Sequence, residues 1–428
     1  MLIEFSVENF RSIRELQTLS LIASSGKELQ STNIAQAESG PQPLLRSAVI
    51  YGPNAAGKSN FFRAAGFVQE FVLTSALRQE GAPIDAAPFA FCRETRAKPS
   101  AFSFTIVEGG IRYQYSLALT KERVTMERLV AYPSGHPQVW FERHYDDEDR
   151  SYRWHFGPNF KADKAQRALM QKTTRSNALF LSTSVQLNDD QLRPLFMWFV
   201  HKFAVINLTS AMNWQLAVEA MQDKGQRTVL NDLVRAADVG IAELDLREEE
   251  LPQAPPGVQL QFQLRTGSVL APSGSGAGIK QLRIVAMHRE VDSDSMVALE
   301  LGDESEGTQK FLQYAGGWIK ALAEGATLFV DELGASLHPS LTQFLVELFH
   351  NSKRNPNGAQ LVLTTHDTNL LNANIFRRDQ IWFTEKDEHA ASKLYPLLEF
   401  SPRKDEVLER GYLRGRYGAI PFIGDVSF

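Results

Sequence analysis

Three short strand-like runs with apolar centres stand out along the chain, and each ends in residues that can carry chemistry. They span residues 48–51, 326–330 and 360–365. A short continuous apolar run is typical of a strand that is buried on both faces of a sheet. We therefore expect three core strands in an α/β fold, with functional residues where these strands end.

Alternating and helical patterns fill the chain between these runs. Residues 102–106 and 113–117 alternate apolar and polar positions on either side of the turn Glu108-Gly109-Gly110, which predicts a β-hairpin. Aromatic residues at 140–141 and 152–154 indicate further short strands. Helical patterns then follow at three places: 165–170, 192–203 and 229–237.

The first apolar run leads into Gly52-Pro53-Asn54-Ala55-Ala56-Gly57-Lys58-Ser59, which is a complete P-loop. Residues 61–65 look helical, so the octet lies between a strand and a helix; a glycine-rich turn that fits by chance is the alternative. Glycines let several backbone N–H groups point at one phosphate chain, and the helix N-terminus adds positive potential. Lys58 is expected to reach the outer phosphates, and the Ser59 hydroxyl to bind Mg²⁺. The nucleotide-binding residues predicted here are Asn54, Ala55, Ala56, Gly57, Lys58, Ser59 and Asn60.

The second and third apolar runs end in two acids and a histidine. Beside a P-loop, Asp331 can hold Mg²⁺ and Glu332 can polarise the attacking water, although acids also cap strand ends. For His366 we favour contact with the terminal phosphate or the attacking water over a structural role. The predicted catalytic residues are therefore Glu332, His366 and Lys58, and the predicted metal ligands include Ser59 and Asp331.

Ser305 and Gly307 precede an amphipathic helix at residues 311–322. Ser305 could be the N-cap of that helix, and a helix N-terminus with Ser and Gly can also receive a phosphate. The two roles are compatible. Since the chain has one P-loop, a second phosphate receptor suggests that two subunits share the nucleotide.

The order of these motifs resembles the ABC-type ATPase heads of the RecF, SMC and OLD group. The first strand and the turn Asn9-Phe10-Arg11-Ser12 look like the N-terminus of that group, in which the turn lies near the nucleotide phosphates; this implies roles for Arg11 and Ser12. Ser305 and Gly307 match the signature that closes on the ATP of the other subunit. Leu337-His338-Pro339 matches the OLD-like branch. Gln186 is the candidate for the glutamine that senses Mg²⁺.

More narrowly, the chain resembles the AAA-family ATPases of bacterial abortive-infection systems, the RloA or AbiL type, nearly from end to end. The tail from Tyr412 to Phe422 is part of that resemblance. The implied architecture is a P-loop NTPase with an ABC-type head, which has a mixed sheet flanked by helices and an antiparallel β lobe. We expect residues 1–160 to form the N-terminal half of the ATPase, 161–250 a helical insert, and 251–428 the C-terminal half.

Two segments of the sequence are typical of connections between structural elements, and the sequence also argues against a long coiled coil. Residues 248–257 are rich in Glu and Pro and resemble a linker, and 272–278 resemble a flexible Gly- and Ser-rich loop. No heptad run is long enough to indicate a coiled coil, which argues against tethering across long arms as in SMC proteins. No guanine-recognition motif is found, so ATP is favoured over GTP.

The composition of the chain bears on its cellular compartment, on disulfide bonds and on DNA binding. The 428 residues are 43% hydrophobic, carry a net charge of −5 and include a single cysteine, Cys92. An internal disulfide is therefore excluded, and the absence of an apolar span or signal pattern favours the cytoplasm. The negative charge argues against a broad non-specific DNA-binding surface, although a local basic groove stays possible.

The expected partners are a second copy of the chain and a separate effector. Sharing of the nucleotide between subunits predicts a homodimer or higher homo-oligomer. No nuclease motif or metal-binding spacing follows the ATPase core, so we expect another protein to deliver the output, and the resemblance implies that it is a nuclease, plausibly of the Toprim type. The helical insert and the tail are the candidate docking surfaces, with packing of the tail on its own core as the alternative. Two other functions stay open: a RecF-like DNA repair or recombination ATPase, and a nucleotide-sensing scaffold.

Overall fold

The computed structural model describes residues 1–35, 42–206, 212–251, 266–273, 278–403 and 406–421. Two compact units share the chain. The first comprises Met1–Val205, Glu324–Leu333 and Glu347–Phe428, and the second comprises Ile206–Ala323 and Gly334–Val346. Each unit joins segments that are distant in sequence, so the boundaries differ from those expected near residues 160 and 250.

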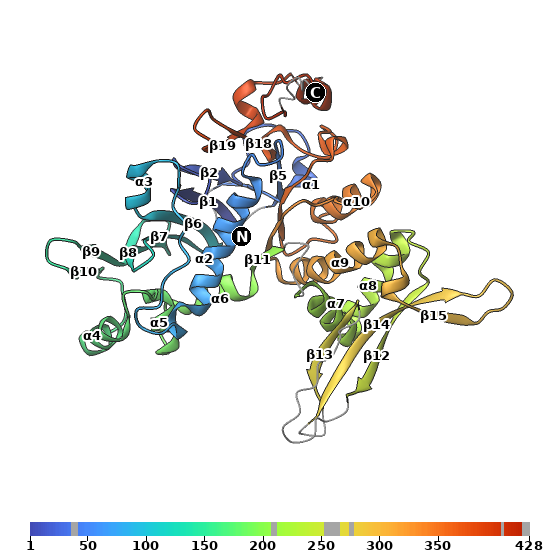
Figure 1. Cartoon of the computed structure of the whole chain (residues 1–428), viewed down its shortest axis with the longest axis horizontal. Coiled ribbons are helices and arrows are strands. Elements are labelled where there is room, and N and C mark those ends of the chain that lie inside the picture. Colours follow the sequence, from blue (N-terminus) through green and yellow to red (C-terminus); the bar gives the residue numbers. More distant parts are fainter. Residues whose placement is uncertain (36–41, 207–211, 252–265, 274–277, 404–405, 422–428) are drawn as a thin grey trace, which may run out of the picture. The chain divides into compact units, whose positions relative to one another are not determined.

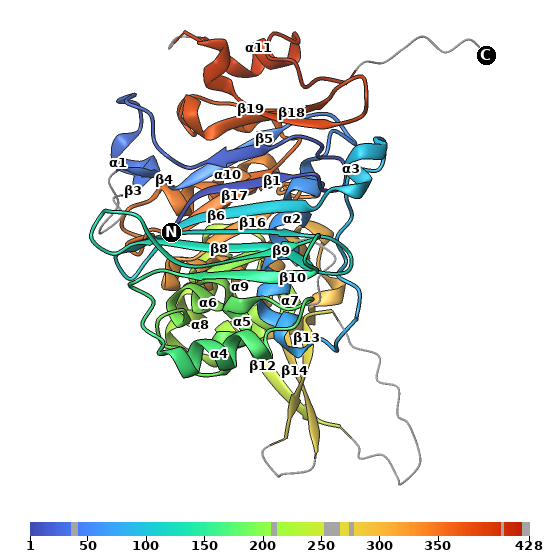
Figure 2. The ribbon, with the colours of Figure 1, turned by 90° about the vertical axis from the view of Figure 1, so that its left-hand side faces the viewer.

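A seven-stranded antiparallel sheet forms one layer of the first unit (Figure 2). Its strands in spatial order are β10 (Ser151–Phe156), β9 (Gln138–Asp146), β8 (Val124–Tyr132), β7 (Ile111–Leu119), β6 (Ser100–Glu108), β1 (Leu2–Glu8) and β2 (Gln17–Ser20). β6 and β7 are the predicted hairpin, with Glu108 paired to Ile111. Gly109 and Gly110 have φ values of 55° and 75°, as the tightest hairpin turn requires of both its central residues.

A six-stranded sheet forms the second layer of this unit. Its strands in spatial order are β11 (Phe203–Ile206), β16 (Thr327–Val330), β17 (Gln360–Thr364), β5 (Ser47–Tyr51), β18 (Ile381–Lys386) and β19 (Ser392–Pro396). The run β16-β17-β5-β18 is parallel and β19 is antiparallel to β18. Every residue of β5, β16 and β17 is buried, which confirms the three strands predicted from the apolar runs. The carboxyl ends of the parallel strands therefore meet at one edge of the sheet.

Helix α2 (Lys58–Thr74) packs between the two sheets of the first unit. One of its aromatic side chains, Phe61, contacts Phe5 of the antiparallel sheet, with ring centroids 5.0 Å apart. The next, Phe62, contacts Phe329 of β16 at 5.1 Å. The helix that follows the P-loop is thus fixed on two faces by aromatic contacts, which holds its N-terminus at the strand ends.

Shorter elements complete the first unit. They are α1 (Gln30–Asn33), β3 (Ile34–Ala35), β4 (Leu44–Leu45), α3 (Arg93–Ala97), α4 (Lys164–Thr173), α5 (Phe180–Gln186), α6 (Arg193–His201) and α11 (Leu408–Leu413), with single 3₁₀ turns at Ser75–Leu77, Thr368–Leu370, Arg378–Gln380 and Leu397–Phe400. The expected helical insert is therefore divided, because α4, α5 and α6 belong to this unit. Leu179, Phe180, Trp198 and Phe199 join its hydrophobic core.

The second unit combines a sheet with helices. It contains α7 (Met212–Gln222), α8 (Lys224–Ala236), β12 (Glu243–Glu250), β13 (Ser268–Pro272), β14 (Ile279–Arg289), β15 (Met296–Glu300), the 3₁₀ turn Leu301–Asp303 and α9 (Glu306–Glu324). β14 is the central strand, flanked by β12 on one edge and by β13 and β15 on the other (Figure 1). Helix α10 (Pro339–His350) crosses the boundary between the units.

The linker predicted at 248–257 is partly a β-strand in the structure. Glu248–Glu250, expected as part of a linker, are the end of β12, because they pair with β14 as far as Lys280. The rest of that segment, 252–257, lies outside the described residues, as do 274–277 of the predicted loop. Among the helices of the described residues, none is both long enough and apolar enough for a membrane span.

Candidate nucleotide-binding site

A cleft of about 460 Å³ lies over the P-loop at the carboxyl edge of the parallel strands. Its lining consists of Pro53, Asn54, Ala55, Ala56, Gly57, Lys58, Ser59, Asn60, Arg63, Glu332, His366 and Lys386. Every one of these residues belongs to the first unit. One cleft thus brings together the P-loop, the second acid after β16 and the histidine after β17, which are far apart in the sequence.

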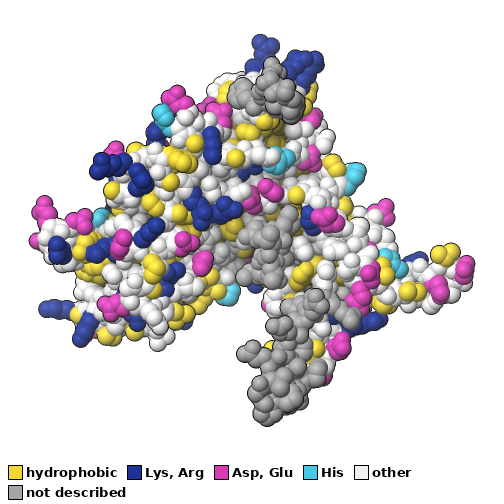
Figure 3. Space-filling model, viewed as in Figure 1, with side chains coloured by type: hydrophobic (Ala, Val, Ile, Leu, Met, Phe, Trp, Pro, Cys, Tyr) yellow, Lys and Arg dark blue, Asp and Glu magenta, His cyan; other side chains and the backbone are white. Residues whose placement is uncertain are grey.

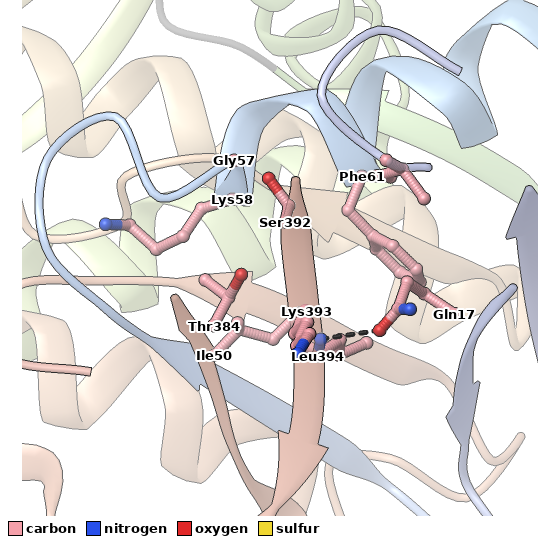
Figure 4. Close-up of a pocket in the computed structure, with 10 residues that line it drawn as sticks. Gln17, Ile50, Gly57, Lys58, Phe61, Thr384, Ser392, Lys393 and Leu394 are labelled. Atoms are coloured by element: carbon pink, nitrogen blue, oxygen red, sulfur yellow. Dashed lines mark hydrogen bonds between the residues drawn. The ribbon is translucent and has the colours of Figure 1, made fainter. Parts of the chain in front are cut away.

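The shape of the P-loop depends on Gly57, which has a φ of 106°. A Cβ atom there would lie 2.0 Å from Ser392 Oγ and 2.8 Å from Ser12 Oγ, so no larger residue fits. The Ser392 hydroxyl points toward the loop (Figure 4) and donates a hydrogen bond to Ala56 O at 2.7 Å. The loop is therefore held from below by strand β19. The cavity of about 10 Å³ between them has room for no more than a water molecule.

Lys58 is folded back onto its own loop. Its Nζ donates hydrogen bonds to Gly52 O at 2.6 Å and to Pro53 O at 3.1 Å. Burial lowers the pKa of Lys58 to about 8, and the nearby Asp331 and Glu332 oppose that shift. The amine has carbonyl partners that phosphate oxygens can replace, which fits the reach expected of a P-loop lysine.

Asp331 and Glu332 follow β16 and are held by one threonine hydroxyl. Thr364 Oγ1 donates to Asp331 Oδ1 at 2.7 Å and accepts from the Glu332 N–H at 2.7 Å. Glu332 has a φ of 56°, a left-handed conformation that is uncommon for glutamate. Its side chain is exposed and lines the cleft, so a water molecule in the cleft can approach its carboxylate.

His366 lines the same cleft from the end of β17. Burial and then the charge of Lys58 lower the pKa of His366, and Glu332 and Asp331 oppose that shift. The imidazole is therefore neutral at pH 7, with one nitrogen able to donate a hydrogen bond and the other able to accept one.

The turn at residues 9–12 supports the site from outside the cleft. Asn9 donates through Nδ2 to Thr95 O at 2.8 Å and accepts from Phe89 N–H at 3.0 Å, so it organises the loop before β6. The Ser12 hydroxyl is buried below the P-loop and accepts from Asn60 Nδ2 at 2.8 Å. Arg11 is exposed and has a φ of 52°. Neither Arg11 nor Ser12 is part of the cleft lining, so their predicted approach to the phosphates stays a prediction.

Gln186 does not lie in the cleft. It ends α5, which is tied to the far end of α2 by hydrogen bonds from Ser182 Oγ to Val72 O at 2.6 Å and from Leu179 N to Ser75 Oγ at 3.1 Å. Val72 is close to the C-terminus of α2, about 20 Å along the axis from Lys58 at 1.5 Å per residue. This position corrects the expectation that Gln186 approaches Mg²⁺ bound at Ser59 and Asp331.

Ser305 and Gly307 lie at the start of α9, in the second unit. Ser305 Oγ accepts from the Thr308 N–H at 3.1 Å, which is the N-cap role expected of it. A Cβ atom on Gly307 would lie 3.0 Å from Ser336 O, so this helix start is closely packed. Their contact with the nucleotide of a second subunit stays a prediction.

Three residues of the site escaped the sequence analysis. Arg63 lies about one turn beyond Ser59 on α2, and Lys386 ends β18, so both add positive charge to the cleft. A signal for Lys386 existed in the apolar run Ile381-Trp382-Phe383, which also ends in charged residues. Thr364 gave no signal, because it is the last residue of β17 and its partners are distant in sequence.

The described part of the tail packs on the first unit. The Tyr412 ring lies 5.7 Å from that of Tyr51 and stacks on Phe383 at 5.5 Å. Glu409 accepts a hydrogen bond from Thr368 Oγ1 at 2.7 Å, two residues after His366. These contacts favour the alternative in which the aromatic residues of the tail belong to its own core; Phe422 lies outside the described residues.

Comparison with known proteins identifies the family of the chain. Residues 47–372 match the family described as "AAA domain, putative AbiEii toxin, Type IV TA system". Together with the strand, loop and helix of residues 47–74, this match confirms the predicted α/β P-loop NTPase fold. No curated protein matches the chain.

One similar solved structure is an SMC head bound to the C-winged helix domain of ScpA. It is 12% identical to this chain, with a TM-score of 0.41, and the alignment covers 92% of this chain and 96% of that one. A similarity at this level carries no conclusion about the site.

Proposed function

The chain belongs to the AAA-domain family that residues 47–372 match, and from that premise we propose that it binds and hydrolyses ATP. The observation that carries the proposal is the cleft in which the P-loop, Glu332 and His366 meet. A P-loop alone supports binding. An accessible carboxylate and a neutral imidazole beside it support hydrolysis, because both can orient and polarise a water molecule.

Five residues have definite roles in this proposal. Lys58 would leave the carbonyls of Gly52 and Pro53 and neutralise the outer phosphates of ATP. Ser59 and Asp331 would hold Mg²⁺, which neutralises phosphate charge when it is bound. Glu332 would take the proton of the attacking water, and His366 would hydrogen-bond the terminal phosphate or that water.

We further propose that two copies of the chain enclose ATP, with the P-loop of one facing Ser305 and Gly307 of the other. Support comes from the resemblance to ABC-type heads and from the start of α9, since a helix N-terminus with a serine is of the kind that can receive a phosphate. A two-fold arrangement repeats the same contact at both sites, so one substitution in α9 damages both.

The biological role proposed here is control of a separate effector in bacterial anti-phage defence, as in the RloA or AbiL type. The sequence carries a complete nucleotide site but no recognised effector chemistry, which supports an output delivered by another protein. A cytoplasmic nuclease, plausibly of the Toprim type, is the partner proposed. On the face shown in Figure 3, the Lys and Arg side chains of the described residues are interspersed with Asp and Glu, so this face offers no extended basic surface for DNA.

Hydrolysis and assembly are tested by two variants. Glu332→Gln should bind ATP but lose turnover by about 10²- to 10⁴-fold, the usual contribution of a general base, and should accumulate as a closed dimer. Ser305→Arg should leave ATP binding to isolated chains intact and abolish turnover. Wild-type turnover in Glu332→Gln would contradict the role of the base, and wild-type turnover in Ser305→Arg would contradict the shared site.

The partner is tested by co-expression with the product of the adjacent gene. We expect the two proteins to co-purify and to lower plaque counts, and we expect Lys58→Ala to remove the protection. No complex and unchanged plaque counts would refute the defence role. ATP turnover stimulated by bare DNA would instead favour a RecF-like function.

A further inference from the structure

We propose that Thr364 is a positioning residue of the site, whose single hydroxyl sets the metal-binding acid and the general base at the same time. The inference rests on the proposed function, because it assumes that Asp331 and Glu332 serve Mg²⁺ and water. It adds a residue that neither the motif pattern nor the family match assigns.

The hydrogen bonds of Thr364 leave its hydroxyl no freedom. A hydroxyl has one proton, and this one is donated to Asp331 Oδ1 at 2.7 Å. A lone pair of the same oxygen accepts the Glu332 N–H at 2.7 Å. Thr364 is fully buried, so water does not compete for either bond.

The bond to Asp331 sets the orientation of its carboxylate. Oδ1 accepts the threonine proton, whereas Oδ2 has no hydrogen-bond partner among the described residues. The hydroxyl therefore fixes the rotation of the carboxylate and leaves Oδ2 with both lone pairs for Mg²⁺. Supporting bonds of this kind orient the ligands of metal sites and contribute to their affinity.

The bond to Glu332 stabilises an unusual backbone conformation. The φ of 56° turns the chain sharply after Asp331, and this turn directs the Glu332 side chain into the cleft. Further bonds hold the same turn: Leu333 N donates to Thr364 O at 2.9 Å, and Thr365 Oγ1 donates to Leu333 O at 2.8 Å. A strained residue that is held by several bonds at a functional site is typical of a preset geometry.

The same two strands provide a matched control. Thr327 begins β16 and is paired with Gln360, at the opposite end of both strands from the cleft. It is also fully buried, and its hydroxyl bonds Gln360 Oε1 at 3.1 Å. Thr327→Val therefore removes a buried threonine hydroxyl between β16 and β17 without contact with either acid.

The experiment compares Thr364→Val, Thr364→Ser and Thr327→Val with the wild-type protein. Binding of a fluorescent ATP analogue is titrated in EDTA and then with increasing Mg²⁺, followed by ATP turnover. Valine matches threonine in shape and lacks the hydroxyl, whereas serine keeps it. We expect Thr364→Val to bind nucleotide normally in EDTA, to need about 10- to 100-fold more Mg²⁺, and to lose turnover.

The two comparison variants define what would overturn the proposal. Thr364→Ser should restore the affinity for Mg²⁺, and Thr327→Val should lower thermal stability alone. Equal losses of Mg²⁺ affinity in the two valine variants would show that Thr364 has only a structural role, and would refute the proposal. Wild-type Mg²⁺ affinity and turnover in Thr364→Val would refute the inference outright.

The design also separates this inference from the proposed function. A wild-type protein that binds Mg²⁺ and nucleotide without hydrolysing ATP would refute the hydrolytic function, whereas the Mg²⁺ titrations would still decide the role of Thr364. A wild-type protein whose nucleotide binding ignores Mg²⁺ would refute both.

Discussion

The first unit holds carboxylates in two contrasting ways. Glu127, on β8, is fully buried, and each of its oxygens has two partners. Oε1 accepts from Tyr115 Oη and Leu181 N, both at 2.9 Å. Oε2 accepts from Phe180 N at 2.7 Å and pairs with Arg143 Nη2 at 2.9 Å. The carboxylate thereby ties the antiparallel sheet to the first N–H groups of α5.

The two acids that follow β16 are bonded much more sparsely. Asp331 receives one hydroxyl proton, from Thr364, and the carboxylate of Glu332 has no hydrogen-bond partner among the described residues. Both acids lie at the open carboxyl edge of the parallel strands, where Glu332 is exposed. Their oxygens keep lone pairs for a metal ion or a water molecule.

A structural acid and a functional acid differ in the number of hydrogen bonds that their carboxylates accept. A buried carboxylate is stable only when donors satisfy it, and a satisfied carboxylate has no lone pair left for a ligand. An acid with free oxygens in a cleft costs little, because solvent reaches it, and it remains available for chemistry. Residue type alone does not distinguish the two cases.

The largest expected effect comes from Glu127→Gln, which keeps the shape and removes the charge that pairs with Arg143. Breaking a fully buried ion pair leaves an uncompensated charge, so the free energy of unfolding should fall by about 3–5 kcal/mol. Urea denaturation measures this loss, with Glu94→Gln in an exposed pair with Lys98 as a control that should change little. Nucleotide binding by the folded fraction should be unaffected; a selective loss of Mg²⁺ affinity would erase the contrast between the two regions.

Asp331→Asn should lower the affinity for Mg²⁺ and leave stability unchanged, which is the reverse of the result expected for Glu127→Gln. The change in binding free energy should be smaller than the change in the free energy of unfolding expected for Glu127→Gln. Stability to urea should be kept, because an amide can still accept the Thr364 proton. The apparent affinity for Mg²⁺ should fall by at least about 10- to 100-fold, since a direct ligand should matter no less than its supporting partners. The Mg²⁺ dependence of nucleotide binding measures this effect. A destabilised variant with normal Mg²⁺ affinity would show that Asp331 is a structural acid.

Local chemistry explains which parts of the site the sequence predicts. The P-loop octet and the short apolar runs before Asp331 and His366 are contiguous segments, and parallel strands bring their ends to one edge. The hairpin of β6 and β7 is equally local, because alternation and two glycines specify it. Three strand ends therefore predict the cleft without any knowledge of distant contacts.

Long-range pairing explains what the sequence does not predict. The Thr364 hydroxyl bonds to residues more than thirty positions away in the sequence. Ser12 is hydrogen-bonded to Ser392 below the P-loop and does not line the cleft. Helical periodicity identifies α6 but neither α5 nor the partner on which both helices pack. The aromatic contacts of Phe180 and Phe199 place these helices in the first unit, and Gln186 is carried away from the P-loop with α5.

The smallest expected effect concerns the charge of Lys58, the cation that faces both acids. Burial lowers its pKa from 10.5 to about 8, so the free protein loses this charge as the pH rises through 8. Phosphate favours the charged amine and raises its pKa again, so binding takes up a proton above pH 8. The affinity for ATP should therefore fall as pH rises from about 8, by at most about tenfold per pH unit for one proton.

Lys58→Arg provides the control, because a guanidinium keeps its charge throughout this range. The variant should bind ATP more weakly, since its planar head does not reproduce the lysine geometry, but its affinity should not change between about pH 7.5 and pH 9.5. Calorimetric titrations across that range measure both proteins. A flat profile for the wild type would mean that Asp331 and Glu332 hold Lys58 fully charged. A parallel decline in both proteins would assign the titration to another group. A decline in the wild type alone would show that Lys58 can be neutral beside Asp331 and Glu332 and becomes charged when phosphate binds. The buried Glu127 differs, because its partner Arg143 keeps its charge throughout this pH range.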